Sequence, residues 1–212
     1  MAADSPFDAR AATWDADPAK VDRARRVAEA IAGEVPDLAG RSVLDYGAGT
    51  GLLGFELLPR VAGVTFADVS RGMLAEVEAK IARSGAANAT AMPLDLSAGP
   101  APRRFGLVVT LMAMHHVRDV PAMLRAFHGA LEERGVLCVA DLDEEDGSFH
   151  GAGFDGHRGF RREAFAGWLR EAGFDRIRFS TPVAEQREVA GVVRTYPVFL
   201  AVADRSGARS AG

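Results

Sequence analysis

The amino-acid sequence predicts an α/β protein with a mostly parallel sheet and helices on both of its faces. Strand-like and helical segments alternate strictly from Asp17 to Leu142, and this alternation indicates parallel strands joined by helical crossovers. The segment "FGLVVTLMAM", which begins at Phe105, is apolar throughout, as is typical of a strand covered on both faces. A turn with three glycines, within "VLDYGAGTG", separates a short apolar strand from a helical pattern. Together these features place a parallel sheet at the centre of the fold.

Helices are expected where apolar residues recur at helical spacing behind a capping residue. Asp17, followed by Pro18, opens the first helix, and Ser70 and Asp119 are expected to open later ones in the same way. In chain order, the helices are expected to run from Asp17 to near Gly33, around Leu52 to Leu58, from Ser70 through Ile81, from Asp119 through Leu131 toward Gly135, and across Phe165 to Leu169 before Gly173.

Seven segments have the composition of strands. The last two, "FDRIRFS" and "YPVFLAVAD", have no helical pattern between them, so they are expected to pair as an antiparallel hairpin. The segment from Asp143 to Arg158 is acidic and glycine-rich, which indicates a loop or flap. In chain order, the expected strands cover 42–46, 61–69, 87–96, 105–114, 135–142, 174–180 and 196–204.

A chain of 212 residues is long enough for one α/β domain and rather short for two. Hydrophobic residues at 48% and charged residues at 25% are near the averages of globular proteins, so neither disorder nor a fibrous repeat is indicated. We therefore expect a single domain over 1–212, with an N-terminal lid and helix at 1–35, a ligand-binding core at 41–142, a flap, helix and antiparallel hairpin at 143–204, and a disordered tail at 205–212.

Charge, hydropathy and cysteine content exclude several classes of partner. The net charge is -4 and the arginines are scattered, so nucleic acid is not expected as a partner. The longest apolar runs, such as "VLCVA", are far below the roughly 18 to 20 residues that cross a bilayer, so no membrane partner is expected. The N-terminus lacks the apolar core of a signal peptide. The single cysteine, Cys138, is expected to be a small buried hydrophobe, and we expect a cytoplasmic protein.

The turn "GAGTG" after the first strand is the expected ligand site. Ligands bind at the carboxyl ends of strands in open parallel sheets, and Gly47, Gly49 and Gly51 would let the main chain pass close to one. The frame from Gly49 to Gly54 also satisfies the glycine spacing of NAD enzymes, which alone is a weak signal. Asp45 would repel a pyrophosphate but attract ammonium and sulfonium groups. The charge of Asp45 therefore favours S-adenosylmethionine over a dinucleotide.

Two further carboxylates end later strands. Asp68 can accept both hydroxyls of an adenosine ribose, a feature that NAD and S-adenosylmethionine share. Asp95 is placed to accept from the adenine amino group, with Leu96 against the ring. For Asp45 and for both of these acids, the alternative is a helix cap or a solvated loop carboxylate.

The segments "VLDYGAGTG", "FADVSRGML", "PLDL" and "FGLVVTLMAMHHV" occur in the order and spacing found in the class I S-adenosylmethionine-dependent methyltransferases. The sequence resembles this family from about Phe7 to Asp204. The resemblance implies a Rossmann-like, seven-stranded, mostly parallel sheet with the last strand antiparallel, and S-adenosyl-L-methionine as the cofactor. One departure is Gly106, where many relatives have an aspartate; it removes a structural contact and leaves the binding residues unaffected.

The resemblance also assigns cofactor roles by position. Gly47, Ala48, Gly49 and Gly51 would wrap the methionine part, Asp45 would support its ammonium through the turn or water, and the main chain near Leu111 would accept from the ammonium. Asp68 would bind the ribose, Val69 and Met73 would lie along the adenine, and Asp95 and Leu96 would hold the adenine edge. Phe7 and Trp14, within "FDARAATWD", would form a lid over the cofactor; the alternative is a tryptophan packed on the core.

Methyl transfer is a direct displacement, so the protein must align the nucleophile and, for a hydroxyl or a carbon acid, accept a proton. His115 and His116 follow the fourth strand and are the first candidates for the base, with His150 and His157 of the flap as weaker ones. Each could equally be a pocket wall or a hydrogen-bond brace. No compact spacing of metal ligands joins them to Asp141 or Asp143, so no metal is expected.

The expected acceptor is a small apolar or amphipathic molecule. Relatives that methylate base amino groups usually carry an Asn/Asp-Pro-Pro-aromatic motif after the fourth strand, and this chain has "TLMAM" there. The acceptor would lie against Met112, Met114 and the aromatic residues Phe149, Phe154 and Phe160, although these aromatics could equally pack within the flap.

We therefore expect an S-adenosylmethionine-dependent methyltransferase of a small molecule, with oxygen or carbon preferred over nitrogen as the acceptor atom. The alternatives are an NAD-dependent oxidoreductase and a non-catalytic cofactor-binding protein. Neither Tyr46 nor Tyr196 has a lysine one turn away, which disfavours the oxidoreductase. The sequence does not specify the oligomeric state.

Overall fold

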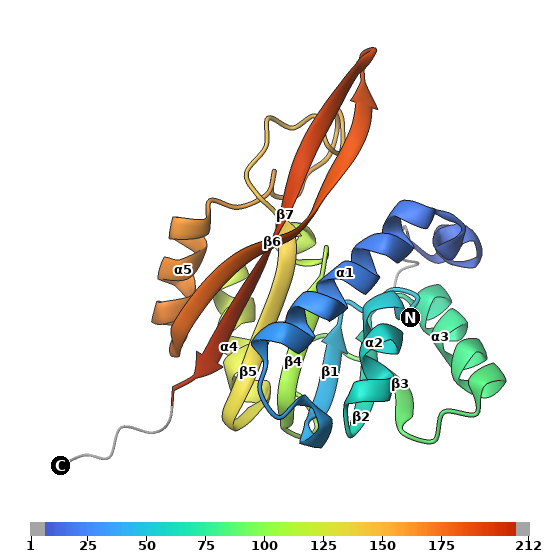
Figure 1. The fold of residues 1–212 in the computed structure, drawn as a ribbon, viewed down its shortest axis with the longest axis vertical. Helices are drawn as coiled ribbons and strands as arrows, with labels where there is room; N and C mark the ends of the chain where they lie inside the picture. Colours follow the sequence, from blue (N-terminus) through green and yellow to red (C-terminus); the bar gives the residue numbers. More distant parts are fainter. Residues whose placement is uncertain (1–6, 207–212) are drawn as a thin grey trace.

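The computed structural model describes residues 7–206 and contains one seven-stranded sheet in the order β3-β2-β1-β4-β5-β7-β6 (Figure 1). Strand β7 is antiparallel to both of its neighbours, and the remaining pairs are parallel. The strands are β1 (Ser42–Tyr46), β2 (Gly63–Asp68), β3 (Ala89–Pro93), β4 (Phe105–Leu111), β5 (Leu131–Leu142), β6 (Phe174–Val189) and β7 (Val192–Arg205). The predicted Rossmann-like sheet with an antiparallel last strand is confirmed.

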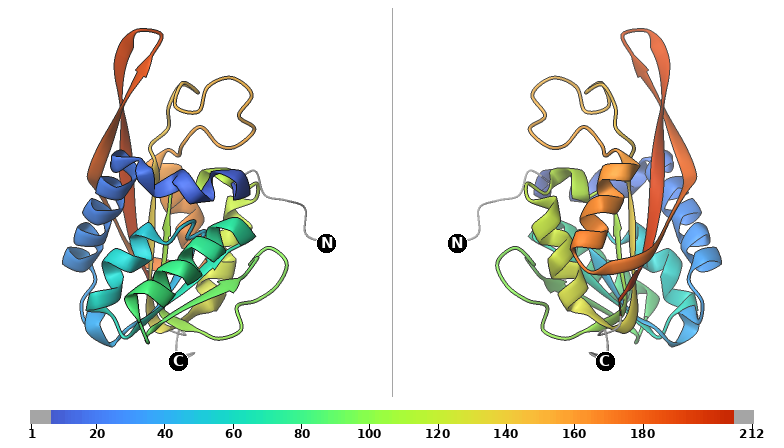
Figure 2. Two further views of the ribbon diagram at one scale, coloured as in Figure 1. Left: turned by 90° about the vertical axis from the view of Figure 1, so that its right-hand side faces the viewer. Right: turned by 90° about the vertical axis from the view of Figure 1, so that its left-hand side faces the viewer.

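Helices cover both faces of the sheet. Figure 2 shows α1, α2 and α3 in front of the sheet in one view and α4 and α5 in front in the opposite view. Each face has its own cluster of buried apolar side chains, so the helices are held by burial of their apolar sides. The α-helices are α1 (Pro18–Glu34), α2 (Leu52–Leu57), α3 (Arg71–Ser84), α4 (Val120–Ala130) and α5 (Arg162–Glu171), and the short 3-10 helices are η1 (Asp8–Ala16), η2 (Leu38–Gly40), η3 (Leu58–Arg60) and η4 (Met114–His116).

The capping residues expected from the sequence begin three of these helices. The side chains of Asp17, Ser70 and Asp119 accept hydrogen bonds from main-chain N–H groups in the first turns of α1, α3 and α4. Pro18 lies at the first helical position of α1, where its missing N–H costs nothing. These helix starts, which fix the turns above the sheet, follow directly from local sequence.

The C-terminal part differs from the prediction in several boundaries. Leu131 was expected at the end of the helix, but it begins β5 and pairs with Phe105, because an apolar residue at helical spacing also fits an inward strand position. The hairpin of β6 and β7 is much longer than expected and extends beyond the end of β5 (Figure 1). Strand β7 continues to Arg205, where a disordered tail was predicted; residues 207–212 of that tail lie outside the described residues.

Three segments rise above the carboxyl ends of the central strands. Figure 2 shows η1, the irregular segment 143–161 and the hairpin at this end of the sheet. Cys138 lies within β5 as a free, fully buried thiol, and burial raises its pKa, so it is a hydrophobic residue as expected. Within residues 7–206, no helix combines the length and apolar character needed to span a membrane.

Candidate functional site

A cavity of about 820 Å³ lies at the carboxyl ends of the central strands, within the range of about 300 to 1,000 Å³ that is usual for small-molecule sites. It gathers residues from η1, α1, the glycine turn, and the ends of β2, β3 and β4. Twelve of the thirteen predicted cofactor residues line it: Phe7, Trp14, Asp45, Gly47, Ala48, Gly49, Asp68, Val69, Met73, Asp95, Leu96 and Leu111.

The thirteenth residue, Gly51, does not line the cavity. It precedes α2 with φ 85°, and a Cβ there would lie 2.9 Å from Cε1 of Phe66. Gly47 and Gly49 also have positive φ values, 66° and 56°, so the turn needs residues without a side chain. Gly51 thus supports the turn from behind, and Gly47 and Gly49 face the cavity.

Gly54 explains why the sequence also satisfies the glycine spacing of NAD enzymes. It lies in α2, and a Cβ at this position would be 2.4 Å from Cε1 of Phe66 and 2.7 Å from Oδ2 of Asp45. The close packing of α2 on the sheet therefore requires this glycine, whichever ligand binds.

Replacement of Gly54 by alanine is expected to destabilise the protein by about 1 to 3 kcal/mol through overpacking, and to lower Tm by several degrees. Gly33→Ala is the matched control, because Gly33 lies in α1 and a Cβ there meets nothing within 4 Å. Thermal unfolding of both variants measures the effect. Equal Tm values for the two variants would show that α2 does not need the close approach.

Asp45 is the buried carboxylate of the site. It is 1% exposed, and its Oδ2 accepts a hydrogen bond from Gly54 N at 3.0 Å. Burial raises the pKa of Asp45 to about 7, and the hydrogen bond from Gly54 acts in the opposite direction. Asp45 both lines the cavity and carries an uncompensated charge when ionised, so a cation in the cavity would stabilise it.

The other two acids differ in how firmly they are held. Asp68 accepts hydrogen bonds from Gly49 N and from Ser70 N, both at 2.8 Å, and so ties the glycine turn to the start of α3. Each of its oxygens keeps a second lone pair for a ligand hydroxyl. Asp95 accepts two bonds from Ser97 through Oδ1, in the local turn that was its alternative role, and also lines the cavity.

Segment η1 lies over α3 and brings two aromatic rings to the cavity. Asp8 accepts from Ser70 Oγ at 2.6 Å and from Gly72 N at 2.8 Å, which fixes η1 at the start of α3. The rings of Phe7 and Trp14 lie 6.0 Å apart, and both residues line the cavity. Trp14 belongs to neither buried cluster of the sheet, so its position favours the lid over the alternative of core packing.

Two cations of α1 that sequence analysis did not single out also line the cavity. Lys20 lies with its Nζ 3.9 Å from the centroid of the Trp14 ring and 3.5 Å from Asp17 Oδ2. Arg23 is one turn further along α1 and is 7% exposed. Their spacing along a helix that opens beside the predicted lid was the available signal, since positions three apart share a helix face.

Of the five histidines, all of which lie within the described residues, only His116 lines the cavity. Its ring is 5.3 Å from that of Phe7 in the lid. Burial and the neighbouring His115 lower the pKa of His116 to about 4, so its imidazole is neutral near neutral pH. His116 is thus a hydrogen-bond acceptor in the wall of the cavity.

His115 lies behind His116 and is 1% exposed. Its Nδ1 is 2.6 Å from Oδ1 of Asp141, and its main-chain N donates to Oδ2 of the same carboxylate at 3.2 Å. Leu142 N donates to Asp141 Oδ1 at 2.8 Å. The ends of β4 and β5 are therefore joined by a buried histidine–carboxylate pair.

His150 and His157 lie in segment 143–161. His150 stacks on Phe154 at 3.9 Å, and burial lowers its pKa to about 4. His157 N donates to His115 O at 2.8 Å, and its Nε2 is 2.9 Å from Val117 O, so His157 braces this segment. Neither residue lines the main cavity, although His157 and His116 share a smaller adjoining cavity of about 460 Å³.

The residues expected along the acceptor have mixed positions. Met112 and Met114 line the cavity. Phe160 is 3% exposed and packs in the cluster beneath α4 and α5, so it belongs to the core. Among residues 7–206, no three histidine, cysteine or acidic side chains are arranged to hold a metal ion.

The cavity fits S-adenosylmethionine at both of its ends. Asp68 and Asp95 would offer acceptors to ribose and adenine, beside apolar Met73, and Asp45 and Lys20 would offer opposite charges to the ammonium and the carboxylate. A dinucleotide would instead place phosphates near Asp45, where like charges repel in a partly desolvated site. These charges favour a cationic amino-acid nucleoside over a dinucleotide.

Comparison with known proteins agrees with this class. Residues 20–178 match the family model of methyltransferase domains. A ubiquinone biosynthesis O-methyltransferase of Pseudomonas aeruginosa is 28% identical over 153 residues, which are 65% of this chain and 66% of that protein. The chain spans 43% to 66% of the length of the first curated relatives that it matches. The chain belongs to the class I S-adenosylmethionine-dependent methyltransferases.

Two solved structures show the same fold. The YcgJ protein of Bacillus subtilis has a TM-score of 0.70 at 14% identity, covering 85% of this chain and 99% of that chain. The magnesium protoporphyrin IX methyltransferase of Synechocystis, solved with bound S-adenosylhomocysteine, has a TM-score of 0.63 at 21% identity, covering 88% of this chain and 84% of that chain.

Proposed function

We propose that this protein methylates a hydroxyl oxygen of a small, flat acceptor. The observation that carries the proposal is His116, a neutral histidine in the wall of the cofactor cavity. A hydroxyl needs an acceptor for its proton when its oxygen becomes a nucleophile. The relative from Pseudomonas aeruginosa, whose name states an O-methyltransferase, supports oxygen as the acceptor atom.

When bound, S-adenosylmethionine supplies a methyl group attached to a sulfonium sulfur. The sulfur is the leaving group: it keeps the electron pair of the carbon–sulfur bond as the acceptor oxygen bonds to the methyl carbon. His116 orients the hydroxyl by accepting its hydrogen bond and takes the proton as the oxygen bonds to carbon. A histidine with a pKa near 4 is a weak base, so its main contribution is alignment. The products are a methyl ether, the neutral thioether and a proton, which returns to solvent.

The pair of His115 and Asp141 positions His116. Asp141 holds the His115 ring through Nδ1, and the rings of His115 and His116 lie 4.2 Å apart. Segment 143–161 is held against the same pair by the bond from His157 N to His115 O. These contacts fix the wall of the cavity at the end of β4, so the acceptor hydroxyl meets a rigid partner.

Aromatic rings around His116 suit a flat acceptor. Phe7 lies on one side of His116, and Phe154 lies 5.4 Å from it on the flap side. His150 stacks on Phe154, and neither of these two residues lines the cavity. Offset or edge contacts with the rings that do line the cavity, those of Phe7 and His116, would stabilise an aromatic ligand by roughly 0.5 to 1.5 kcal/mol each.

Matched phenols, anilines and thiophenols test the acceptor atom. Incubation with S-adenosylmethionine and mass spectrometry of the products should show methyl transfer to phenols, with slower transfer to the anilines. Faster transfer to the anilines than to the phenols would contradict the proposal. Absence of transfer to the whole panel, despite tight binding of S-adenosylhomocysteine, would contradict it in favour of a non-catalytic binding protein.

A further inference from the structure

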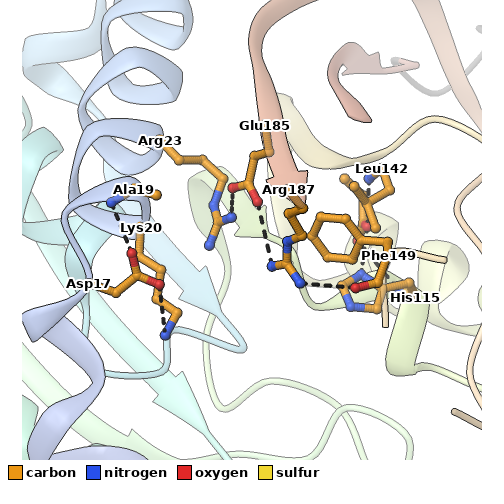
Figure 3. Close-up of polar contacts among 10 residues, drawn as sticks. Asp17, Ala19, Lys20, Arg23, His115, Leu142, Phe149, Glu185 and Arg187 are labelled. Atoms are coloured by element: carbon orange, nitrogen blue, oxygen red, sulfur yellow. Dashed lines mark hydrogen bonds and ion pairs between the residues drawn. The ribbon is translucent and has the colours of Figure 1, made fainter. Parts of the chain in front are cut away.

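Arg23, which lines the cavity, belongs to a cluster of charges with the buried Glu185 and the exposed Arg187. Arg23 of α1 forms an ion pair with Glu185 of β6, and the two residues are 7% and 9% exposed (Figure 3). Arg187 lies on the other side of Glu185, with 3.6 Å between its Nη2 and Oε2 of Glu185. Two guanidinium groups therefore share one carboxylate, so the cluster has an excess positive charge.

Arg23 has a hydrogen-bond donor left over. Its Nε–H is buried and has no acceptor within residues 7–206. Oε1 of Glu185 contacts Nη1 of Arg23 in the ion pair and makes no other hydrogen bond in this part of the chain. An unsatisfied buried donor costs about 1 to 3 kcal/mol, and more when it is charged. Arg23 also lines the cavity, so a ligand there lies beside a guanidinium group with an unused donor.

The other carboxylates that act on Arg23 do not remove its excess charge. Asp17 and Asp141 both interact with it electrostatically, but neither forms an ion pair with it. Asp17 lies 3.5 Å from Lys20 Nζ, and Asp141 already accepts hydrogen bonds from His115 and Leu142. Burial and the neighbouring Arg187 lower the pKa of Arg23 to about 10, so it remains a cation near neutral pH.

The cofactor needs one cation for its carboxylate, and three cationic side chains of the described residues line the cavity: Lys20, Arg23 and Arg118. Lys20 stands beside Trp14 of the lid, next to the residues that fit the cofactor. Arg23 instead contacts Glu185 of the hairpin. Glu185 also contacts Arg187, which is hydrogen-bonded to segment 143–161 on the acceptor side. Arg187 donates to Phe149 O at 2.9 Å, and its guanidinium lies 3.6 Å from the centroid of the Phe149 ring (Figure 3).

We propose that Arg23 binds a carboxylate of the methyl acceptor, so that the acceptors are aromatic hydroxy acids. This inference rests on the proposed function, because it names the substrate class of the same site. The planar guanidinium would present the side that is not paired with Glu185 to the carboxylate, while Glu185 holds it from the other side. The acid group would then anchor the acceptor, with its hydroxyl directed to His116.

Equilibrium binding tests the proposal without turnover. Hydroxybenzoates and hydroxycinnamates are titrated into the complex with S-adenosylhomocysteine, each beside its uncharged amide. For at least one pair, the acid is expected to bind about tenfold or more tightly than the amide, as a charge-assisted hydrogen bond predicts. No preference for any acid over its amide would overturn the proposal, whether or not the protein methylates phenols.

Two variants assign the preference to Arg23. Arg23→Gln should abolish the preference for the acid, and Glu185→Gln, which removes the competing carboxylate and keeps Arg23, should increase it. The double variant R23Q/E185Q lacks both charges, and it replaces Arg23→Gln in the binding experiment if that single variant fails to fold. If the Arg23 variants weaken binding of S-adenosylhomocysteine tenfold and leave the acid preference intact, Arg23 serves the cofactor carboxylate and the proposal is wrong.

These outcomes separate the inference from the proposed function. A preference for acids that depends on Arg23, without methylation of phenols, would contradict the hydroxyl acceptor but support the carboxylate site. Methylation of phenols with equal binding of acid and amide would support the hydroxyl acceptor and contradict the carboxylate site.

Discussion

Replacement of Asp45 by asparagine is expected to weaken binding of S-adenosylmethionine on the order of 100-fold at about pH 8, because loss of one partner from a desolvated charge pair costs roughly 2 to 5 kcal/mol. The carboxylate lines the cavity, and within residues 7–206 its charge forms no ion pair, so the ligand that we place there would be its cationic partner. Asparagine keeps the acceptor for Gly54 N–H, so the turn itself is preserved.

The same variant is expected to be more stable than the wild type in the absence of ligand. Burial raises the pKa of Asp45 to about 7 from its ordinary value of 3.8. Between these values the folded state holds a proton that the unfolded state has lost, so stability falls as pH rises through this window. Above about pH 7 the full cost is present, on the order of a few kcal/mol, and asparagine removes it.

Calorimetric titration and thermal unfolding measure the two effects of Asp45→Asn. For the wild type, the dissociation constant should increase up to tenfold for each pH unit below about pH 7, as Asp45 gains a proton; for the variant it should not depend on pH in this range. Asp37→Asn is the matched control, because Asp37 is an exposed residue with φ 53°, which asparagine tolerates. Unchanged affinity in the Asp45 variant would contradict the electrostatic account of the cofactor site.

Replacement of His116 by alanine is expected to lower kcat on the order of 100-fold with a phenolic acceptor, because the variant loses the group that aligns the hydroxyl and accepts its proton. Binding of S-adenosylhomocysteine should stay within about threefold of the wild type, because the charged groups of the cofactor site are untouched. The neutral form of His116 is the active one, so the wild-type kcat should not fall until the pH approaches its pKa of about 4.

Single-turnover kinetics of His116→Ala and His116→Gln separate chemistry from binding. His128→Ala is the control, because His128 packs on Phe174 in the fold and does not line the cavity. A kcat for the His116 variants equal to that of the control would mean that another group, or none, accepts the proton.

Much of this fold could be predicted from local sequence. Asp17, Ser70 and Asp119 cap their helices as expected, and the alternation of strands and helices predicted that the first five strands are parallel. Leu131 could not be assigned, since burial in a helix and burial in a strand require the same apolar residue. The length of the hairpin was missed because its outer half has few buried residues, so its sequence has no strong alternation.

The site was predictable to the extent that it lies on one continuous motif. The glycine turn and the acids near the ends of β1 and β2 are local, and the sequence places them at one edge of the sheet. The pair of His115 with Asp141 and the pair of Arg23 with Glu185 join residues that are far apart in the chain. Such pairs depend on tertiary packing, and a single sequence does not indicate which charged side chains will form a pair.

Calorimetric titration of the wild-type protein with S-adenosylhomocysteine and with NADH at about pH 8 tests the central claim most directly, since this is above the pKa of Asp45. The account predicts saturable binding of S-adenosylhomocysteine at micromolar concentration or below, and no saturable binding of NADH. Binding of NADH alone would contradict it, because a pyrophosphate would then occupy the turn beside the buried carboxylate.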